Sequence, residues 1–444
     1  MGSEDVGSEV VGSEVRAPQS SVRRLMAGAG FRYEGGEFVE QSEFRERSEF
    51  MEQSDRGSIV ASMTELARSA SLERVSMLAW RDLEDPEAGG SEVHAARVAE
   101  LWASAGIDVT MRTSFAAGKP QVAWRDGYRV IRKAGRYMVF PRASFSEMMG
   151  WHGGRDGLVE IWNGMPFFSP VWARTPNVTW FHHVHADMWN MTLPPRIAGI
   201  GRALESSIAP KFYRRTPIIT LSDSSKSELV HELGFKDRMV HVVPPGVDTK
   251  FSAGGEKSIR PLVVAVGRLV PVKRFDLLVE VLIALKERQP DLEAVIAGEG
   301  YERDALEAQI KSAGADGWIS LLGRVNDDAL ISLYRRAWVL ASVSAREGWG
   351  MTITEAAACG TPAVATNIAG HSDAVKDGAS GLLGKSREDL VDALDRVISD
   401  EGLRVRLSEG ALENASRLTW ESTAYGTLEV LANEATRRKS AQKD

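Results

Sequence analysis

Two cations in the C-terminal half have the types and spacing needed to hold a phosphorylated ligand. Arg268 and Lys273 follow the apolar run PLVVAVG and precede an amphipathic segment, so both lie where a strand should end and a helix begin. Two cations beside the free N–H groups of a helix N-terminus form a site for a diphosphate. Taken alone, the pattern fits an exposed loop with two solvated cations equally well.

Two glutamates further on are separated by seven residues in the segment EGWGMTITE, which runs from Glu347 to Glu355. Gly350 lets the backbone approach a ligand closely, and the N–H groups of Met351 and Thr352 open a helix and point at an anion. Glu355 lies about one turn into that helix, where its carboxylate suits vicinal hydroxyls such as those of a ribose. An ordinary helix start with acidic side chains is the alternative, but two glycines at a strand end favour a ligand site.

The charged residues described above can lie at strand ends only if strands alternate with helices. The sequence contains two such alternating series. The first series has strand-like runs at 74–80, 107–111, 137–140, 158–162, 178–182 and 218–222, and a helical pattern at 91–105. The second follows the Pro244-Pro245-Gly246 breaker and has strand-like runs at 262–266, 293–297, 319–322, 339–342 and 363–366. Apolar strands between amphipathic helices predict parallel sheets covered on both faces, which bind ligands beyond the carboxyl ends of their strands.

The predicted fold is therefore α/β, with two Rossmann-like domains. We place the N-terminal domain at 71–248, the C-terminal domain at 249–420, and a C-terminal helix and tail at 421–444. Residues 1–70 repeat Gly-Ser-Glu, are rich in acidic residues and lack apolar periodicity, which predicts a disordered or loosely held extension. This extension is either a regulatory tail or an overlong reading frame whose true start is Met51 or Met63.

Composition excludes several classes of protein. The 444 residues are 43% hydrophobic and 26% charged, with a formal net charge of -7, which disfavours a nucleic-acid binder. The single cysteine, Cys359, excludes a disulfide framework and a cysteine-based zinc site. No apolar run reaches the roughly 18 residues that a bilayer span needs, and we expect a cytoplasmic protein.

The order of the C-terminal motifs resembles that of glycosyltransferase family 4, the retaining family with the GT-B fold whose members include the glycosyl transferases of group 1. The two charged pairs are followed by AAACGTP and GASGLL, and PPGVD and LGRV match further signatures of the family. The similarity covers about residues 72–435. It implies two Rossmann-like domains with parallel sheets facing across a cleft, and a C-terminal helix that crosses back to the N-terminal domain.

The resemblance also implies roles for individual residues. His182, at a strand end, and Glu347 would be the catalytic residues beside the transferred sugar. The donor-binding residues would hold the diphosphate, the ribose and the nucleobase, and they are Gly89, Gly90, Arg268, Lys273, Arg324, Val325, Gly350, Met351, Thr352 and Glu355. The family needs no metal and no cofactor, and we expect the same here.

The function implied is transfer of a hexose-type sugar from a nucleotide-sugar donor to a hydroxyl acceptor, which is a glycan, a lipid or a small molecule. A nucleotide-sugar epimerase and a non-catalytic nucleotide-sugar binding protein of the same fold are the alternatives. Neither the sugar nor the nucleobase follows from the sequence.

Two features of the predicted N-terminal domain allow more than one interpretation. His183 and His185 follow His182, but no nearby cysteine or fourth histidine completes a zinc site. The stretches 112–142 and 194–215 are basic, which fits either solvated charge or peripheral contact with an anionic membrane that carries a lipid-linked acceptor. Nucleic acid is not expected as a partner.

Overall fold

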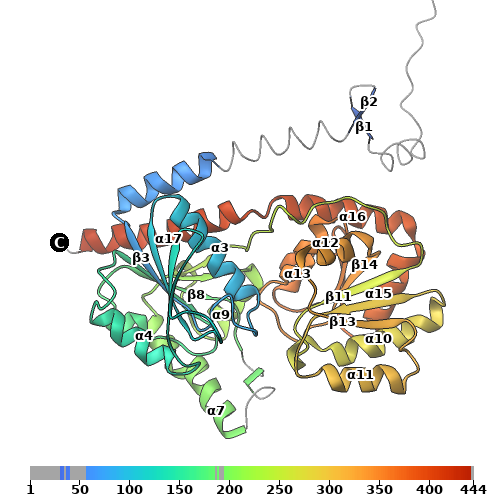
Figure 1. Ribbon diagram of the computed structural model, residues 1–444, viewed down its shortest axis with the longest axis horizontal. Helices are drawn as coiled ribbons and strands as arrows, with labels where there is room; N and C mark the ends of the chain where they lie inside the picture. The colour runs from blue at the N-terminus through green and yellow to red at the C-terminus, as the bar shows by residue number, and fades with distance from the viewer. Residues whose placement is uncertain (1–30, 35–36, 41–56, 186–187, 190–194, 442–444) are drawn as a thin grey trace, which may run out of the picture. The chain divides into compact units, whose positions relative to one another are not determined.

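The structure is a computed structural model of the chain, and it describes residues 31–34, 37–40, 57–185, 188–189 and 195–441 (Figure 1). Residues 1–58 and 59–444 are separate units. In the first unit, β1 (Phe31–Glu34) and β2 (Glu37–Glu40) form an antiparallel pair. Most of residues 1–56, and with them most of the predicted loose extension, lie outside the described residues.

The N-terminal sheet has eight strands in the order β10-β9-β8-β7-β3-β4-β6-β5. Its strands are β3 (Arg74–Leu78), β4 (Asp108–Ser114), β5 (Val122–Arg125), β6 (Tyr128–Ala134), β7 (Gly157–Trp162), β8 (Asn177–Phe181), β9 (Ile218–Thr220) and β10 (Val240–Val242). Every pairing in this sheet is parallel except that of β5 with β6. Helices α3 (Gly90–Ser104), α4 (Val139–Met148), α5 (Ser169–Trp172), α7 (Pro195–Ala203), α8 (Pro210–Tyr213) and α9 (Asp223–His231) connect them.

The antiparallel strand β5 was not predicted, although the sequence contains its signal. Asp126 and Gly127 join β5 to β6 with φ angles of 45° and 83°. Positive φ at both central residues defines the tight hairpin turn that Asp-Gly favours. The dipeptide between two β-rich runs was therefore sufficient evidence for a hairpin.

The strand predicted at 137–140 is wrong, because these residues begin helix α4. Val139 and Phe140 are buried on the inner face of that helix, and Pro141 is its third residue. A proline in the first turn costs no hydrogen bond, since the N–H groups there have no partner within the helix. The run of aromatic and β-branched residues has the composition of a strand, and the proline is consistent with either a strand or the first turn of a helix.

The C-terminal sheet has six parallel strands in the order β13-β12-β11-β14-β15-β16. The strands are β11 (Leu262–Val266), β12 (Glu293–Ala297), β13 (Ile319–Gly323), β14 (Val339–Ser342), β15 (Ala363–Thr366) and β16 (Gly381–Gly384). Helices α10 (Phe275–Arg288), α11 (Arg303–Ser312), α12 (Asp327–Arg336), α13 (Met351–Ala358), α14 (His371–Ala374), α15 (Arg387–Ser399) and α16 (Glu401–Ser416) accompany them. Two Rossmann-like α/β domains are therefore confirmed, while the predicted domain boundaries remain predictions.

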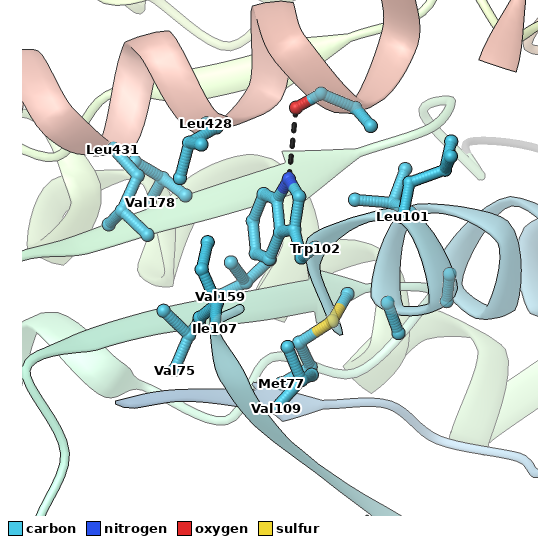
Figure 2. Packing of buried hydrophobic residues seen from close by; sticks show 14 of the residues in the cluster. Val75, Met77, Leu101, Trp102, Ile107, Val109, Val159, Val178, Leu428 and Leu431 are labelled. Atoms are coloured by element: carbon cyan, nitrogen blue, oxygen red, sulfur yellow. Dashed lines mark hydrogen bonds between the residues drawn. The ribbon is translucent and has the colours of Figure 1, made fainter. Parts of the chain in front are cut away.

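The last helix, α17 (Trp420–Ala441), packs against the N-terminal sheet beside α3, as the family fold implied (Figure 1). Figure 2 shows its Leu428 and Leu431 among core residues of β3, β7 and β8. The indole N–H of Trp102 donates to the carbonyl oxygen of Ala424 over 3.0 Å. Because Trp102 is fully buried, this bond satisfies a donor that would otherwise cost free energy in the core.

The chain passes between the two sheets twice, and the two passages are hydrogen-bonded to each other. Val247 N–H donates to the carbonyl oxygen of Leu418 over 3.0 Å, and the hydroxyl of Thr423 donates to that of Pro244 over 2.8 Å. A Cβ placed on Gly246 would lie 2.2 Å from the backbone nitrogen of Trp420. Glycine is therefore required where the passages cross.

Residues 57–70 correct the prediction of a loose segment up to residue 70, because they form a helix. Met63, Ala67 and Ala70 are buried in the hydrophobic core of the N-terminal sheet. The repeats in the preceding residues concealed the short apolar stripe at 59, 60, 63, 66, 67 and 70, which has helical spacing. Among the described residues, no helix is long and apolar enough to cross a bilayer.

We predict that Met63→Ala lowers the free energy of unfolding by about 2–4 kcal/mol, because it leaves a cavity in a fully buried position. Glu65→Ala, at an exposed side chain of the same helix, is the control and should change stability by less than about 0.5 kcal/mol. Denaturant unfolding of both variants tests this. Equal, small effects would show that residues 57–70 lie outside the folded core.

Candidate donor-binding site

The loop between β14 and α13 carries the first glutamate and a glycine in the left-handed region. Gly350 precedes α13 with φ of 112°. A Cβ at this position would lie 3.0 Å from Ile353 Cδ1 and 3.1 Å from His371 Cδ2. The tight packing and the positive φ both require glycine at the start of α13.

Lys273 and Glu347 form an ion pair in the structure, although the sequence analysis assigned them to different parts of the ligand. The Lys273 ammonium donates to Glu347 Oε1, and the Ser344 hydroxyl donates to the same oxygen over 2.8 Å. Burial opposes ionisation of Glu347, but the charges of Lys273 and His371 outweigh it and lower the pKa of the carboxyl. Glu347 is therefore ionised, and its carboxylate is already paired with the Lys273 ammonium at the strand end.

Glu355 behaves differently from Glu347. Its Oε2 accepts a hydrogen bond from the Tyr334 hydroxyl over 3.0 Å. Burial raises the pKa of Glu355 to about 7, and the Tyr334 hydrogen bond and Lys250 only partly oppose this effect. The carboxyl of Glu355 thus exchanges its proton near neutral pH, and it can accept from, or donate to, a ligand hydroxyl.

Two arginines from the C-terminal sheet reach the loop that precedes α3. Arg268 Nη1 donates to the carbonyl oxygen of Glu87 over 3.4 Å, and Arg324 Nη2 donates to that of Pro86 over 3.0 Å. Gly89 and Gly90, at the end of the same loop, also pack against residues of the C-terminal domain. A Cβ on Gly89 would lie 3.5 Å from Arg268 Nε, and one on Gly90 would lie 2.9 Å from the sulfur of Met351.

The structure thus brings together most of the predicted donor-binding residues. Arg268, Arg324 and Met351 each contact the loop 86–90, which carries Gly89 and Gly90. Lys273 lies on the same loop as Arg268, and Gly350 directly precedes Met351. Val325 packs instead against a hydrophobic core of the C-terminal sheet. Thr352 is half-buried in the first turn of α13, and Glu355 lies one turn further along.

His182 follows β8 directly and is only 4% exposed. Its Nε2 lies 3.1 Å from Nδ1 of His94 in α3. Burial lowers the pKa of His182 to about 4, so the imidazole is neutral at physiological pH. A Cβ on Gly348 would lie 2.4 Å from the His182 carbonyl oxygen; the loop that carries Glu347 therefore packs against the end of β8.

Comparison with known proteins identifies the family. The model described as Glycosyltransferase Family 4 matches residues 88–251, and the model described as Glycosyl transferases group 1 matches residues 247–414. The chain belongs to glycosyltransferase family 4. The predicted family and the class of transferase are thereby confirmed.

Several curated relatives in this family are D-inositol 3-phosphate glycosyltransferases. The D-inositol 3-phosphate glycosyltransferase of Kribbella flavida is 34% identical over 232 residues, which are 48% of this chain and 55% of that protein. The one of Corynebacterium urealyticum is 28% identical over 391 residues, or 78% of this chain and 90% of that protein. The match to the first relative thus spans only about half of its length.

Among solved structures, the sucrose-phosphate synthase of Thermosynechococcus elongatus superposes with a TM-score of 0.70. The alignment covers 83% of this chain and 100% of that chain, with 18% sequence identity. This family 4 chain therefore has the GT-B fold, as predicted.

His94 is the residue at this site that the sequence analysis missed. It lies in the predicted helix at 91–105 and shares helical spacing with the buried residues Val98 and Leu101. A polar residue on the buried face of a helix needs a partner, and this was the signal available in the sequence. Its partner, His182, is 88 residues away and could not be inferred from spacing.

His183 and His185, which follow His182, form a separate cluster. The rings of His183 and His185 stack with centroids 4.6 Å apart, and His185 Nδ1 lies 3.2 Å from Glu205 Oε1. Among the residues that the structure describes, no group of three or more His, Cys, Asp or Glu side chains is placed to hold a metal ion. The expectation that the reaction uses no metal remains a prediction.

The two basic stretches differ in the structure. Within 112–142, five cations are in ion pairs with carboxylates, and they are Arg112, Lys119, Arg125, Arg132 and Arg136. Arg112 and Arg132 are buried, at 3% and 1% exposure. Interpreting 112–142 as solvated or membrane-facing charge is therefore wrong for Arg112 and Arg132, whose acidic partners come from other segments of the chain, whereas Lys119 and Arg136 are exposed.

We predict opposite pH dependence for Glu355→Gln and Glu347→Gln. The pKa of Glu355 is raised in the folded state, so folding takes up a proton between about pH 4.5 and 7 and wild-type stability falls as pH rises through this window. Glu355→Gln should gain stability relative to wild type from about pH 5 to 8. The pKa of Glu347 is lowered, so its contribution is present at neutral pH and is lost as pH falls through the folded pKa.

Thermal unfolding midpoints at several pH values measure these differences. Glu347→Gln should be destabilised at neutral pH, and the deficit should shrink in acid. Glu413→Gln, at an exposed side chain of α16, is the control and should follow wild type. A Glu355→Gln profile parallel to wild type would contradict the raised pKa.

Proposed function

We propose that this chain is a retaining glycosyltransferase that transfers a hexose-type sugar from a nucleotide-sugar donor to a hydroxyl acceptor. The observation that carries the proposal is the convergence of Arg268, Lys273 and the N-terminus of α13 at the carboxyl ends of neighbouring strands. Two cations beside free backbone N–H groups suit the diphosphate of such a donor. Family membership supports the same chemistry.

The other donor contacts follow from the same geometry. Glu355, whose carboxyl carries a proton part of the time near neutral pH, would bind the ribose hydroxyls from inside α13. Arg324, on the loop after β13, would flank the nucleobase, and Val325 would contribute only the part that its packing against the core leaves exposed. Glu347 would face the transferred sugar, where its negative charge offsets the positive charge that develops as the glycosidic bond breaks.

The proposed reaction needs no protein nucleophile. The bond from the anomeric carbon to the diphosphate oxygen breaks, the acceptor oxygen bonds to the same face of that carbon, and the acceptor proton passes to the leaving diphosphate. The protein orients the two substrates and stabilises the leaving charge through Arg268 and Lys273. His182 and Glu347 would be the side chains beside the sugar.

The relatives are D-inositol 3-phosphate glycosyltransferases, which supports a small phosphorylated polyol as the acceptor. An epimerase or a non-catalytic binding protein would not consume an acceptor. Release of free nucleoside diphosphate that depends on an inositol phosphate separates these classes. Because the nucleobase is not fixed by the sequence, thermal shift with UDP, GDP and ADP should precede the assay, since the cognate nucleotide stabilises by mass action.

We predict that Lys273→Ala and Arg268→Ala each lower turnover by roughly 30- to 1000-fold, which corresponds to losing about 2–4 kcal/mol of charge-assisted stabilisation. Arg260→Ala is the matched control, because Arg260 is exposed and precedes the opposite end of β11. It should keep wild-type turnover. Wild-type turnover by Lys273→Ala and Arg268→Ala would remove the diphosphate assignment.

A second proposal concerns location: we infer a cytoplasmic enzyme in peripheral contact with the inner face of an anionic membrane. The helical segment from α7 to α8 exposes Ile197, Ile200, Ile208 and Phe212 at helical spacing, and Ile200 is 70% exposed. Arg196, Lys211, Arg214 and Arg215 are exposed on the same segment. Apolar and basic side chains together favour insertion at a charged interface.

We predict that the protein sediments with phosphatidylglycerol vesicles and that Ile200→Glu weakens this binding at least about fivefold, since a charge replaces an inserted apolar group. Ile259→Glu is the control, because Ile259 is fully exposed outside this segment. Phosphatidylcholine vesicles should bind neither protein well. Equal binding of wild type and Ile200→Glu would contradict membrane contact through this segment.

A further inference from the structure

Helix α9 of the N-terminal domain contacts the loop of the C-terminal domain that carries Glu347. Arg346 Nη1 donates to both carboxylate oxygens of Glu228, over 2.9 and 3.1 Å. The side chains of Arg346 and Glu228 are only 21% and 19% exposed. Burial raises the pKa of Glu228, and the charge of Arg346 opposes this effect. Loss of either partner would therefore leave a largely buried charge without its counter-ion.

The start of α9 makes a second contact with the C-terminal domain, at α14 and the turn that precedes it. The Ser224 hydroxyl donates to Asp373 Oδ2 and accepts a hydrogen bond from the Gly370 N–H over 2.8 Å. The backbone N–H of Asp223 donates to Asp373 Oδ1 over 3.1 Å. Both oxygens of Asp373 are thus bonded at the positive end of the α9 dipole, where a carboxylate is favoured.

Both contacts reach Glu347 through the backbone. Arg346 precedes Glu347 directly in the chain. A Cβ placed on Gly370 would lie 2.7 Å from the Glu347 carbonyl oxygen and 2.7 Å from the Trp349 nitrogen, so the turn that bonds Ser224 packs on residues 347–349. Docking of α9 therefore restrains the loop that carries Glu347 from two directions along the chain.

We propose that Ser224 and Glu228 are positioning residues, which hold the Glu347 loop in place for the reaction through their contacts with Asp373 and Arg346. We call these contacts the α9 clamp. Because the partners come from two domains, movement of one domain relative to the other would separate them and release the loop. The clamp thus couples the arrangement of the domains to the position of the Glu347 carboxylate, and it rests on the proposed role of Glu347 beside the transferred sugar.

Kinetics of single variants test the clamp. Glu228→Gln and Arg346→Gln should each lower kcat at least about fivefold, because the remaining charge loses its counter-ion and the two domains lose a contact. The KM for the donor should change less than kcat, since the proposed diphosphate contacts lie within the C-terminal domain. Glu232→Gln is the matched control, because Glu232 is exposed one turn further along α9, and it should keep wild-type kcat.

The double variant distinguishes one shared interaction from two separate effects. If Glu228 acts through Arg346, Glu228→Gln should have little further effect on kcat when Arg346 is already glutamine. Effects that multiply in the double variant would overturn the proposal, and so would wild-type kcat in either single variant.

Hydrogen–deuterium exchange tests the position of the loop without an activity assay. Peptides that cover residues 345–350 should exchange faster in Ser224→Ala and Glu228→Gln than in wild type and Glu232→Gln, while peptides from α17 should keep wild-type rates. Wild-type exchange at 345–350 would overturn the proposal. Faster exchange throughout the protein would overturn it as well, because the residues would then act on the fold.

The outcomes separate the clamp from the proposed function. If the wild-type protein transfers no sugar to an acceptor, the proposed function is wrong, and hydrogen exchange still decides whether α9 holds the loop. If the wild-type protein transfers sugar but Glu228→Gln does so at the wild-type rate, the positioning role alone is wrong.

Discussion

The ion pair between Lys273 and Glu347 is the interaction on which the charge of the site depends. Lys273 follows β11 and Glu347 follows β14, and these two strands are neighbours in the C-terminal sheet. Parallel pairing places their carboxyl ends side by side, so the strand order alone brings the two loops together. A buried carboxylate without such a partner would take up a proton; the ammonium therefore keeps Glu347 charged in the absence of a ligand.

The ion pair also helps to keep the loops of the site in one conformation. Ser344 fixes the same oxygen of Glu347, and the packed, left-handed Gly350 fixes the entry to α13. The backbone N–H groups and the ammonium are therefore oriented before a ligand arrives. Preorganised charge of this kind would cost no rearrangement if a diphosphate binds here as proposed.

Local patterns in the sequence were sufficient for five of the six strands of the C-terminal sheet, but they missed β16 and were insufficient at several points elsewhere. Strands such as β11 and β14 are continuous apolar runs, and the cations and glycines at their ends predict both the end of the strand and the proposed phosphate site. The helix at 57–70 was hidden by the low-complexity residues before it, and α4 was hidden because Val139 and Phe140 favour strands. The pairing of Arg112 with Glu147, or of His94 with His182, arises only when distant segments fold together.

The return of α17 to the N-terminal sheet, bonded through Trp102 and Ala424, has a topological consequence. The N-terminal domain is discontinuous, because its core contains residues from both ends of the chain. The C-terminal domain is a single uninterrupted segment inserted between them. A contiguous piece of the gene thus encodes the C-terminal domain in full, whereas the N-terminal domain is assembled from two separate pieces. Exchange of C-terminal domains between homologues would leave the residues of the N-terminal core in place, while removal of α17 would break that core.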